Sequence, residues 1–234
     1  MKKLLLVVIL LIPMHSLQAL ERVGDFALLD HKGDFHQIGR YNYQNAVVLL
    51  SEGANCDSFS SSLAQFNAVS NDYSENFEFM LLNATGTQDR ATVLAQAETY
   101  DNNLPLLMDE SQVVSELLGV SKIGEALVID PDRFELLYRG SVANLEQALE
   151  QIAAGDEVSS PETVASGCGV KFAAKQLHDR APVSYSADIA PILEKNCASC
   201  HRDQGIAPFA MDSHLMIQGW APMIKEVVMT KRMP

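Results

Sequence analysis

Apolar residues in the first 150 positions of the chain form two kinds of pattern, continuous runs and a helical spacing of three and four residues. The run 46–50 is continuously apolar, which suits a central strand buried on both faces, and further strands are predicted at 77–82 and 125–129. Apolar residues spaced three and four apart run from Phe59 to Tyr73, which predicts an amphipathic helix. Weaker patterns predict strands at 25–29, 104–108 and 134–138 and helices at 90–100, 111–118 and 144–154, the last capped by Asn144 and ended near Gly155. This order predicts an α/β fold in which a mixed sheet carries helices on both faces.

The pattern changes after residue 155. Residues 161–182 lack clear periodicity, so we expect a linker at 171–183 between a domain at 20–170 and a small all-α unit at 184–234. A helix is predicted to run into Cys197, with Asp188 as its N-cap. A second helix is predicted at 221–232.

Cys197-Ala198-Ser199-Cys200-His201 is a CxxCH run, the sequence used for covalent attachment of a c-type haem. Two thiols one helical turn apart can each add to a haem vinyl group, and the adjacent imidazole then lies under the iron as its proximal ligand. The alternatives are a redox CxxC with an incidental histidine and half of a zinc site, but only His214 follows nearby as a further zinc ligand. We therefore predict one covalent haem c held by Cys197, Cys200 and His201.

The first residues indicate export. Met1-Lys2-Lys3 precedes an apolar run at 4–14 and a small-residue cleavage site at Ala19, which is typical of a secretory signal peptide at 1–19. No stretch reaches the roughly 20 apolar residues that a membrane-spanning helix needs, so no stable membrane insertion is expected. The predicted location is the periplasm.

The net charge of the chain indicates which classes of binding partner are expected. Removing the signal peptide takes away Lys2 and Lys3, which lowers Lys plus Arg from 17 to 15 against 30 acidic residues and gives a net charge near −15. So acidic a chain disfavours nucleic acid and anionic membrane, and favours a redox partner with a basic docking surface or simply a solvated surface.

Residues 24–172 resemble the redoxin and peroxiredoxin-like branch of the thioredoxin-like superfamily. The resemblance is carried by Val-Gly-Asp-Phe-Ala-Leu at 23–28, by the strand-turn-Cys56-helix unit, and by Glu-Ala-Leu-Val-Ile-Asp-Pro at 125–131. It implies a thioredoxin-like fold. A cysteine at a helix N-terminus sees a positive partial charge that favours the thiolate, so Cys56 is a candidate reactive thiol.

The residues around Cys56 depart from both branches of that family. A thioredoxin would have a second cysteine at Phe59 and a cis-proline at Gly124, whereas a peroxiredoxin would have threonine or serine at Gly53 and proline at Leu49. Cys168 is the other cysteine outside the CxxCH run. The two cysteines either form a disulfide, static or redox-active, or remain thiols, and the sequence leaves these alternatives open.

Residues 185–234 resemble cytochrome c modules of exported bacterial proteins, in which a helix with tryptophan ends in Arg-Met-Pro. Here the matching residues are Trp220, Arg232, Met233 and Pro234. The resemblance implies that Met233 is the distal iron ligand, with His214 as the alternative, and that the remaining methionines are packing residues. Met223 and Met229 are expected to pack against the haem. Such proteins commonly continue, so the chain is interpreted as a fragment that lacks a downstream domain.

The sequence thus predicts an exported redox protein that carries single electrons on a c-type haem. Two alternatives stay open. The first is a thiol peroxidase or disulfide reductase that uses the haem as an electron conduit. The second is a redox-inert thioredoxin-like scaffold that docks the cytochrome module to a partner or to the missing domain.

Overall fold

The computed structural model describes residues 21–53, 55–86, 90–99 and 103–233. The predicted signal peptide lies outside the described residues.

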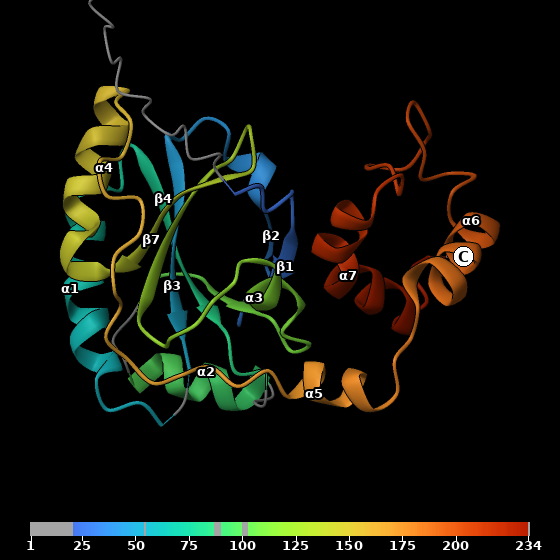
Figure 1. Ribbon diagram of the computed structural model, residues 1–234, viewed down its shortest axis with the longest axis horizontal. Helices are drawn as coiled ribbons and strands as arrows, with labels where there is room; N and C mark the ends of the chain where they lie inside the picture. The colour runs from blue at the N-terminus through green and yellow to red at the C-terminus, as the bar shows by residue number, and fades with distance from the viewer. Residues whose placement is uncertain (1–20, 54, 87–89, 100–102, 234) are drawn as a thin grey trace, which may run out of the picture.

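A five-stranded sheet forms the centre of the chain (Figure 1). Its strands are β3 (Ala46–Glu52), β4 (Phe77–Asn83), β5 (Leu106–Met108), β6 (Glu125–Asp130) and β7 (Glu135–Ser141), in the spatial order β5-β4-β3-β6-β7. Strands β3, β4 and β5 are parallel, and β6 and β7 run antiparallel to their neighbours. Every residue of β3 is buried, which explains why its apolar run is continuous rather than alternating.

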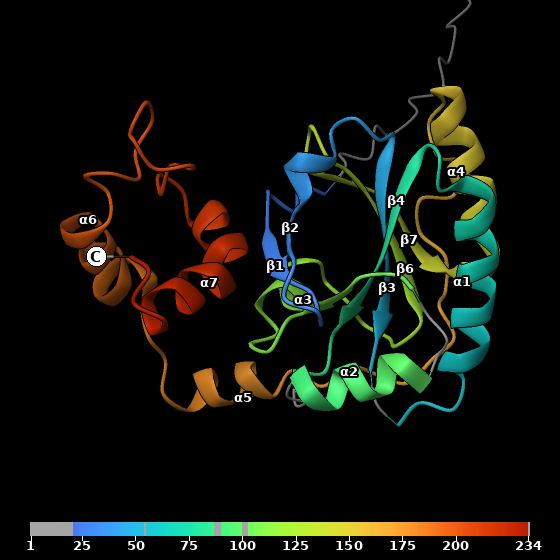
Figure 2. The same ribbon diagram turned by 180° about the vertical axis from the view of Figure 1, so that it is seen from behind.

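Helices α1 (Phe59–Tyr73) and α4 (Leu145–Ala154) cover one face of the sheet (Figures 1 and 2). α1 buries Phe59, Leu63 and Phe66 on its inner side, and the Phe66 ring meets Phe79 of β4 edge-on at 5.4 Å between centroids. The helix therefore forms because its apolar stripe fits the buried sheet face.

The other side of the sheet carries a two-stranded antiparallel hairpin, β1 (Ala27–Leu29) with β2 (Phe35–Gln37), and the short helix α3 (Val113–Leu117). The hairpin is tied to the β5 edge, because the His31 amide donates to the Leu106 carbonyl at 2.9 Å. Helix α2 (Arg90–Thr99) lies at the foot of the sheet in Figure 1. The succession β3-α1-β4 and then β6-β7-α4, with neighbours ordered β4-β3-β6-β7, is a thioredoxin-like fold.

Most of the predicted elements of this domain are confirmed, but one cap is wrong. Asn144 precedes α4 without a capping hydrogen bond from its side chain. A 3-10 turn, η2 (Val142–Asn144), comes first, and the Ser141 hydroxyl caps that turn by accepting from the Ala143 amide at 3.2 Å. Gly155 ends α4 in the left-handed region at φ 77°, as predicted. The strand β2 was not predicted.

The regular elements that the structure describes after residue 170 are all helical. Its elements are α5 (Ala173–Arg180), the π-helical turn η3 (Tyr185–Ile189), α6 (Ala190–Asn196) and α7 (His214–Met229). α5 lies inside the expected linker. Helix α7 packs on β1 and α3 and buries Ile217, Gly219 and Trp220, whereas η3 and α6 bury no residue. An all-α module with a core of its own is therefore not shown, and the boundary at 171–183 stays a prediction.

Asp188 is not the N-cap that the sequence suggested. The helical turn begins earlier, at Tyr185, because the Ser184 hydroxyl accepts from the Ala187 amide at 3.2 Å and Asp188 Oδ2 accepts from the Ser184 amide at 2.7 Å. This reciprocal pair is a capping box. Likewise α7 starts at His214 rather than near 221, since Ser213 caps it by accepting from the Met216 amide.

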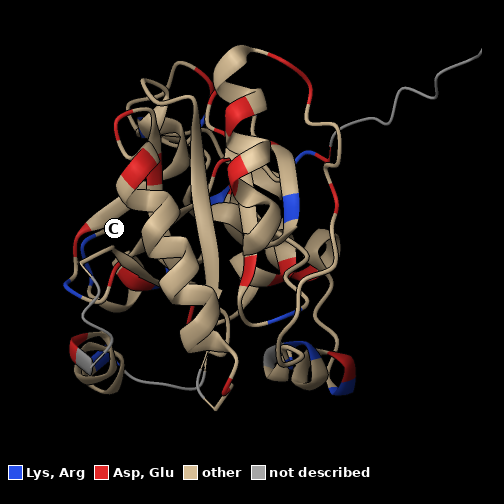
Figure 3. Cartoon of the chain, turned by 90° about the vertical axis from the view of Figure 1, so that its left-hand side faces the viewer, with Lys and Arg blue, Asp and Glu red and all other residues tan. Residues whose placement is uncertain are grey.

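Acidic side chains dominate the face formed by α1 and α4, which Figure 3 views directly. These two helices carry Asp72, Glu146 and Glu150 and contain no lysine or arginine. Among the described residues, no helix combines the length and apolar character needed to cross a bilayer.

Candidate functional site

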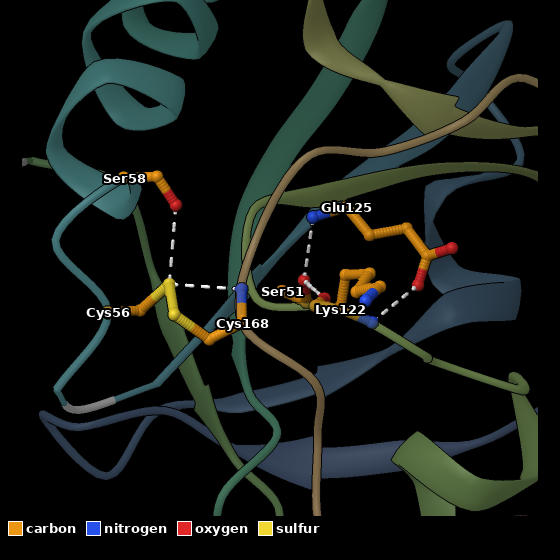
Figure 4. Close-up of a disulfide and its surroundings, with 6 residues drawn as sticks. All are labelled: Ser51, Cys56, Ser58, Lys122, Glu125 and Cys168. Atoms are coloured by element: carbon orange, nitrogen blue, oxygen red, sulfur yellow. Dashed lines mark hydrogen bonds between the residues drawn. A yellow bond between two sulfur atoms is a disulfide. The ribbon is translucent and has the colours of Figure 1, made fainter.

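The chain holds two groups of chemically reactive residues, and the first is a disulfide between Cys56 and Cys168. Cys56 follows the carboxyl end of β3 and precedes α1, while Cys168 lies 112 residues later in the segment that leaves α4 (Figure 4). The two cysteines that the sequence left unassigned are thus brought together at one end of the sheet.

Backbone pairing fixes Cys168 in this position. The Ile123 amide donates to the Cys168 carbonyl at 2.8 Å, and the Val170 amide donates to the Ser121 carbonyl at 3.0 Å. The Ser51 hydroxyl, at the end of β3, donates to the Lys122 carbonyl at 2.6 Å and accepts from the Glu125 amide at 2.9 Å. Hydrogen bonds therefore join the end of β3, the loop before β6 and the segment that carries Cys168.

The two sulfur atoms have different surroundings. Cys56 is 8% exposed, whereas Cys168 is an exposed residue. Cys56 Sγ lies 3.1 Å from the Cys168 amide, which donates to it, and 3.3 Å from the Ser58 hydroxyl oxygen. An external thiolate would meet Cys168 first, and both contacts would stabilise the Cys56 thiolate that leaves.

Glu52, the last residue of β3, is a buried acid that the sequence did not indicate as a site residue. Its side chain is fully buried at the end of β3, and Asn83 Nδ2 donates to one carboxylate oxygen at 2.9 Å. Within the described residues the other oxygen has no hydrogen-bond partner. Burial raises the pKa of Glu52 to about 7, although the bond from Asn83 opposes the rise. A carboxylate that ends an otherwise apolar strand was the available sequence signal.

Gly124 occupies the place of the thioredoxin cis-proline, and its backbone explains why proline is absent. The Gly124 amide donates to the Ser51 carbonyl at 2.8 Å, and its φ is +84°. Proline has no amide hydrogen and is restricted to negative φ. The Phe59 side chain, in place of a second cysteine, is 2% exposed and belongs to the core.

The second reactive group is the CxxCH run, which forms the turn directly after α6. The Cys200 and His201 amides both donate to the Cys197 carbonyl, at 3.1 and 3.0 Å, so the run folds back on itself. Cys197 and Cys200 are free cysteines, and both are partly exposed. The sequence spacing thus brings two accessible thiols and an imidazole into one turn.

His201 is buried, with 4% of its surface exposed, and only one of its ring nitrogens is satisfied. Nδ1 lies 3.1 Å from the Phe209 carbonyl oxygen, and since a carbonyl can only accept, Nδ1 carries the hydrogen. In the neutral ring Nε2 then has a lone pair, and Nε2 has no partner among the described residues. A ring nitrogen fixed by a carbonyl leaves the other nitrogen oriented to bind a metal.

The side chains of the predicted distal ligands, Met233 and His214, have fewer described contacts than that of His201. Met233 follows the end of α7 and is 38% exposed, and its ligation of iron stays a prediction. His214 begins α7, and its ring contacts the Tyr185 ring at 4.4 Å between centroids. Met223 and Met229 line a cavity of about 240 Å³ together with Leu29 of β1, and their packing against a haem stays a prediction.

The two groups lie on separate elements. α6 and α7 stand on the hairpin side of the sheet, whereas α1, which follows Cys56, covers the opposite face (Figures 1 and 2). In the described part of the chain, there is no cluster of three or more His, Cys, Asp and Glu side chains that could hold a bare metal ion.

Comparison with known proteins finds structural likenesses at low sequence identity. No protein-family model matches the chain, and no curated protein matches it. A hypothetical protein from Sinorhizobium meliloti 1021 is 20% identical with a TM-score of 0.57, covering 68% of this chain and 97% of that chain. An uncharacterized conserved protein from Geobacillus kaustophilus is 18% identical with a TM-score of 0.57, covering 67% and 93%. The exposed lipoprotein thioredoxin from Streptococcus pneumoniae strain TIGR4 is 20% identical with a TM-score of 0.49, covering 55% and 99%.

The order of its strands and helices gives the chain a thioredoxin-like fold. At these identities the first two likenesses concern the fold alone.

Proposed function

We propose that the chain is an exported redox protein in which a thioredoxin-like domain with an exchangeable disulfide accompanies a covalent c-type haem. Cys197 and Cys200 would hold the haem through thioether bonds, and His201 would be its proximal ligand. When bound, such a haem supplies one-electron chemistry at its iron. Met233 is proposed as the distal ligand.

The observation that carries this proposal is the unpartnered Nε2 of the buried His201. A buried polar atom without a partner costs about 1–3 kcal/mol, so its presence calls for an explanation. Iron coordination provides one, because the Phe209 carbonyl has already fixed the hydrogen on Nδ1.

Exposed apolar side chains in the segments on either side of the CxxCH run also support haem binding. Ile189 on η3, Ile192 on α6 and Ile206 in the following loop are 36%, 56% and 93% exposed. A porphyrin is a large apolar ring, and covering such side chains is worth roughly 25 cal/mol per Å² buried. The helices around Cys197 would thus gain from the haem the core that they lack alone.

The disulfide supports a thiol exchange activity of the same chain. A substrate thiolate would attack the Cys168 sulfur, forming a mixed disulfide as the Cys168–Cys56 bond breaks and the Cys56 thiolate leaves. A second thiolate on the substrate would then displace Cys168, which leaves the substrate oxidised and both cysteines reduced. The reverse sequence reduces a substrate disulfide.

Location and partner follow from the sequence and its charge. The pattern at 1–19 supports secretion, and the disulfide is compatible with an oxidising compartment such as the periplasm. The acidic face of α1 and α4 supports a basic redox partner.

The experiment is expression of the full chain with its signal in a host that attaches c-type haem. The purified protein should show the Soret and α bands of a c-type haem, and the Cys197→Ser/Cys200→Ser double variant should be colourless. Cys56→Ser/Cys168→Ser is the matched control, which loses two cysteines and keeps the bands. A colourless parent refutes the haem proposal.

A disulfide reductase is the second candidate, and the exposure of Cys168 favours it. Thiol titration of the protein before and after mild reduction distinguishes it from a redox-inert scaffold. Two additional titratable thiols after treatment with a dithiol support exchange, whereas a disulfide that resists the dithiol in the folded protein supports the scaffold. Peroxide turnover, tested separately, would support a thiol peroxidase.

A further inference from the structure

A series of aromatic contacts connects His201 with the thioredoxin-like domain. The rings of His201 and Phe209 lie 4.7 Å apart between centroids. Phe209 stacks on Trp220 of α7 at 4.0 Å with an interplanar angle of 20°, and Trp220 lies 6.2 Å from Phe35 of β2. The imidazole is therefore linked by neighbouring rings to the β1–β2 hairpin.

Trp220 is held firmly at the centre of this series. It is 6% exposed, and its indole approaches the buried Asp25 carboxylate without reaching hydrogen-bond geometry. The neighbouring Gly219 lies so close to the segment just before β1 that a Cβ built there would overlap the Asp25 carbonyl oxygen. A Cβ on Gly24 would come within 2.9 Å of the Leu215 side chain, so α7 also packs closely against Gly24.

Phe209 acts on His201 through two different groups. Its ring packs against the imidazole, and its carbonyl oxygen accepts the Nδ1 hydrogen at 3.1 Å. Whatever fixes the Phe209 ring therefore also fixes the tautomer and the orientation of the imidazole. The stacked indole is the largest group that does so.

We propose that Trp220 is a positioning residue for His201, through which the thioredoxin-like domain orients the proximal ligand of the haem. The role of His201 as a haem ligand rests on the proposed function. The positioning of His201 by Trp220 does not, because it can be measured in the haem-free chain. It assigns the thioredoxin-like domain a role independent of thiol exchange. Phe209 transmits the effect, and the close approach of Gly219 to the segment just before β1 fixes α7.

The first test uses the full chain without haem, labelled with ¹⁵N in its histidine rings. The parent should show His201 as a single Nδ1–H tautomer, assigned by its loss in His201→Ala. Trp220→Ala should give signals averaged between two tautomers, and Trp220→Phe, which can still stack, should restore the single tautomer. An unchanged Nδ1–H tautomer in Trp220→Ala overturns the proposal.

Two further variants separate positioning from stability. Leu149→Ala removes a fully buried side chain from α4, on the opposite face of the sheet, and should leave the His201 signals unchanged. If Trp220→Ala does not fold, Phe209→Leu takes its place, because it removes the stacked ring and keeps the carbonyl. A fixed tautomer in folded Phe209→Leu also contradicts the proposal.

The second test uses the chain with haem. Ferric parent protein should give one low-spin species in its electron paramagnetic resonance spectrum, Trp220→Ala should give more than one, and Trp220→Phe should return to one. A single unchanged species in Trp220→Ala overturns the proposal. If the parent binds no haem, the proposed function fails, and the tautomer measurement still decides the role of Trp220.

Discussion

Replacing Glu52 with glutamine should remove a large part of the pH dependence of stability. Glu52 is fully buried, and its amide analogue has nearly the shape of the protonated acid, is uncharged and keeps a carbonyl oxygen that can accept from Asn83. The substitution therefore fixes the site in its neutral form without opening a cavity.

The magnitude follows from the raised pKa. Burial moves the pKa of Glu52 from 4.5 to about 7, so between these values the folded state binds a proton that the unfolded state has lost. The stabilisation is present in full below pH 4.5 and is lost as the pH rises through about 7. At roughly 1.4 kcal/mol per pKa unit, the loss amounts to about 3 kcal/mol.

The assay is urea unfolding of the oxidised protein at pH 5 and pH 8, followed by far-ultraviolet circular dichroism. Glu52→Gln should match the parent within about 1 kcal/mol at pH 5 and exceed it by about 3 kcal/mol at pH 8. Glu157→Gln, at an exposed position, is the control and should give nearly equal differences at both values. If the free energies of unfolding of Glu52→Gln and the parent differ by the same amount at pH 5 and pH 8, Glu52 does not have a raised pKa in the folded protein.

Three further substitutions test other parts of the structure by the same unfolding assay. Cys56→Ser/Cys168→Ser should lose about 5 kcal/mol in the chain-entropy model, because the disulfide closes a long loop, and a loss below about 1 kcal/mol contradicts that account. Gly124→Pro, which introduces the thioredoxin residue, should lose about 2 kcal/mol or more, because the hydrogen bond to Ser51 disappears and φ must change. A variant as stable as the parent would contradict this expectation. Phe66→Ala should lose about 3–5 kcal/mol at the α1–sheet contact, and a loss below about 1 kcal/mol would mean that this core is not packed as described.

The sequence predicted the sheet domain well because its signals are local. The run 46–50 became the fully buried β3, and the spacing from Phe59 to Tyr73 became α1 with the same bounds. The caps were harder, since Asn144 and Asp188 each had a competitor, Ser141 and Ser184, that the apolar pattern does not reveal.

The candidate site could be predicted only in part. The CxxCH spacing identifies Cys197, Cys200 and His201, but nothing in it predicts that the Phe209 carbonyl meets Nδ1 of His201. The placement of α7 on β1 depends on residues about 190 positions apart, such as Gly219 and Asp25, and local patterns carry no such information. Likewise the raised pKa of Glu52 depends on burial by the whole fold.

The proposed function requires that the sulfur atoms of Cys197 and Cys200 bind a haem covalently. Mass spectrometry of the peptide that contains 197–201, taken from protein exported by a host that attaches c-type haem, measures this bond. This peptide should carry the mass of one haem, and the peptides with Cys56 and Cys168 should carry none. An unmodified 197–201 peptide from such protein would show that the chain does not bind haem through these sulfur atoms.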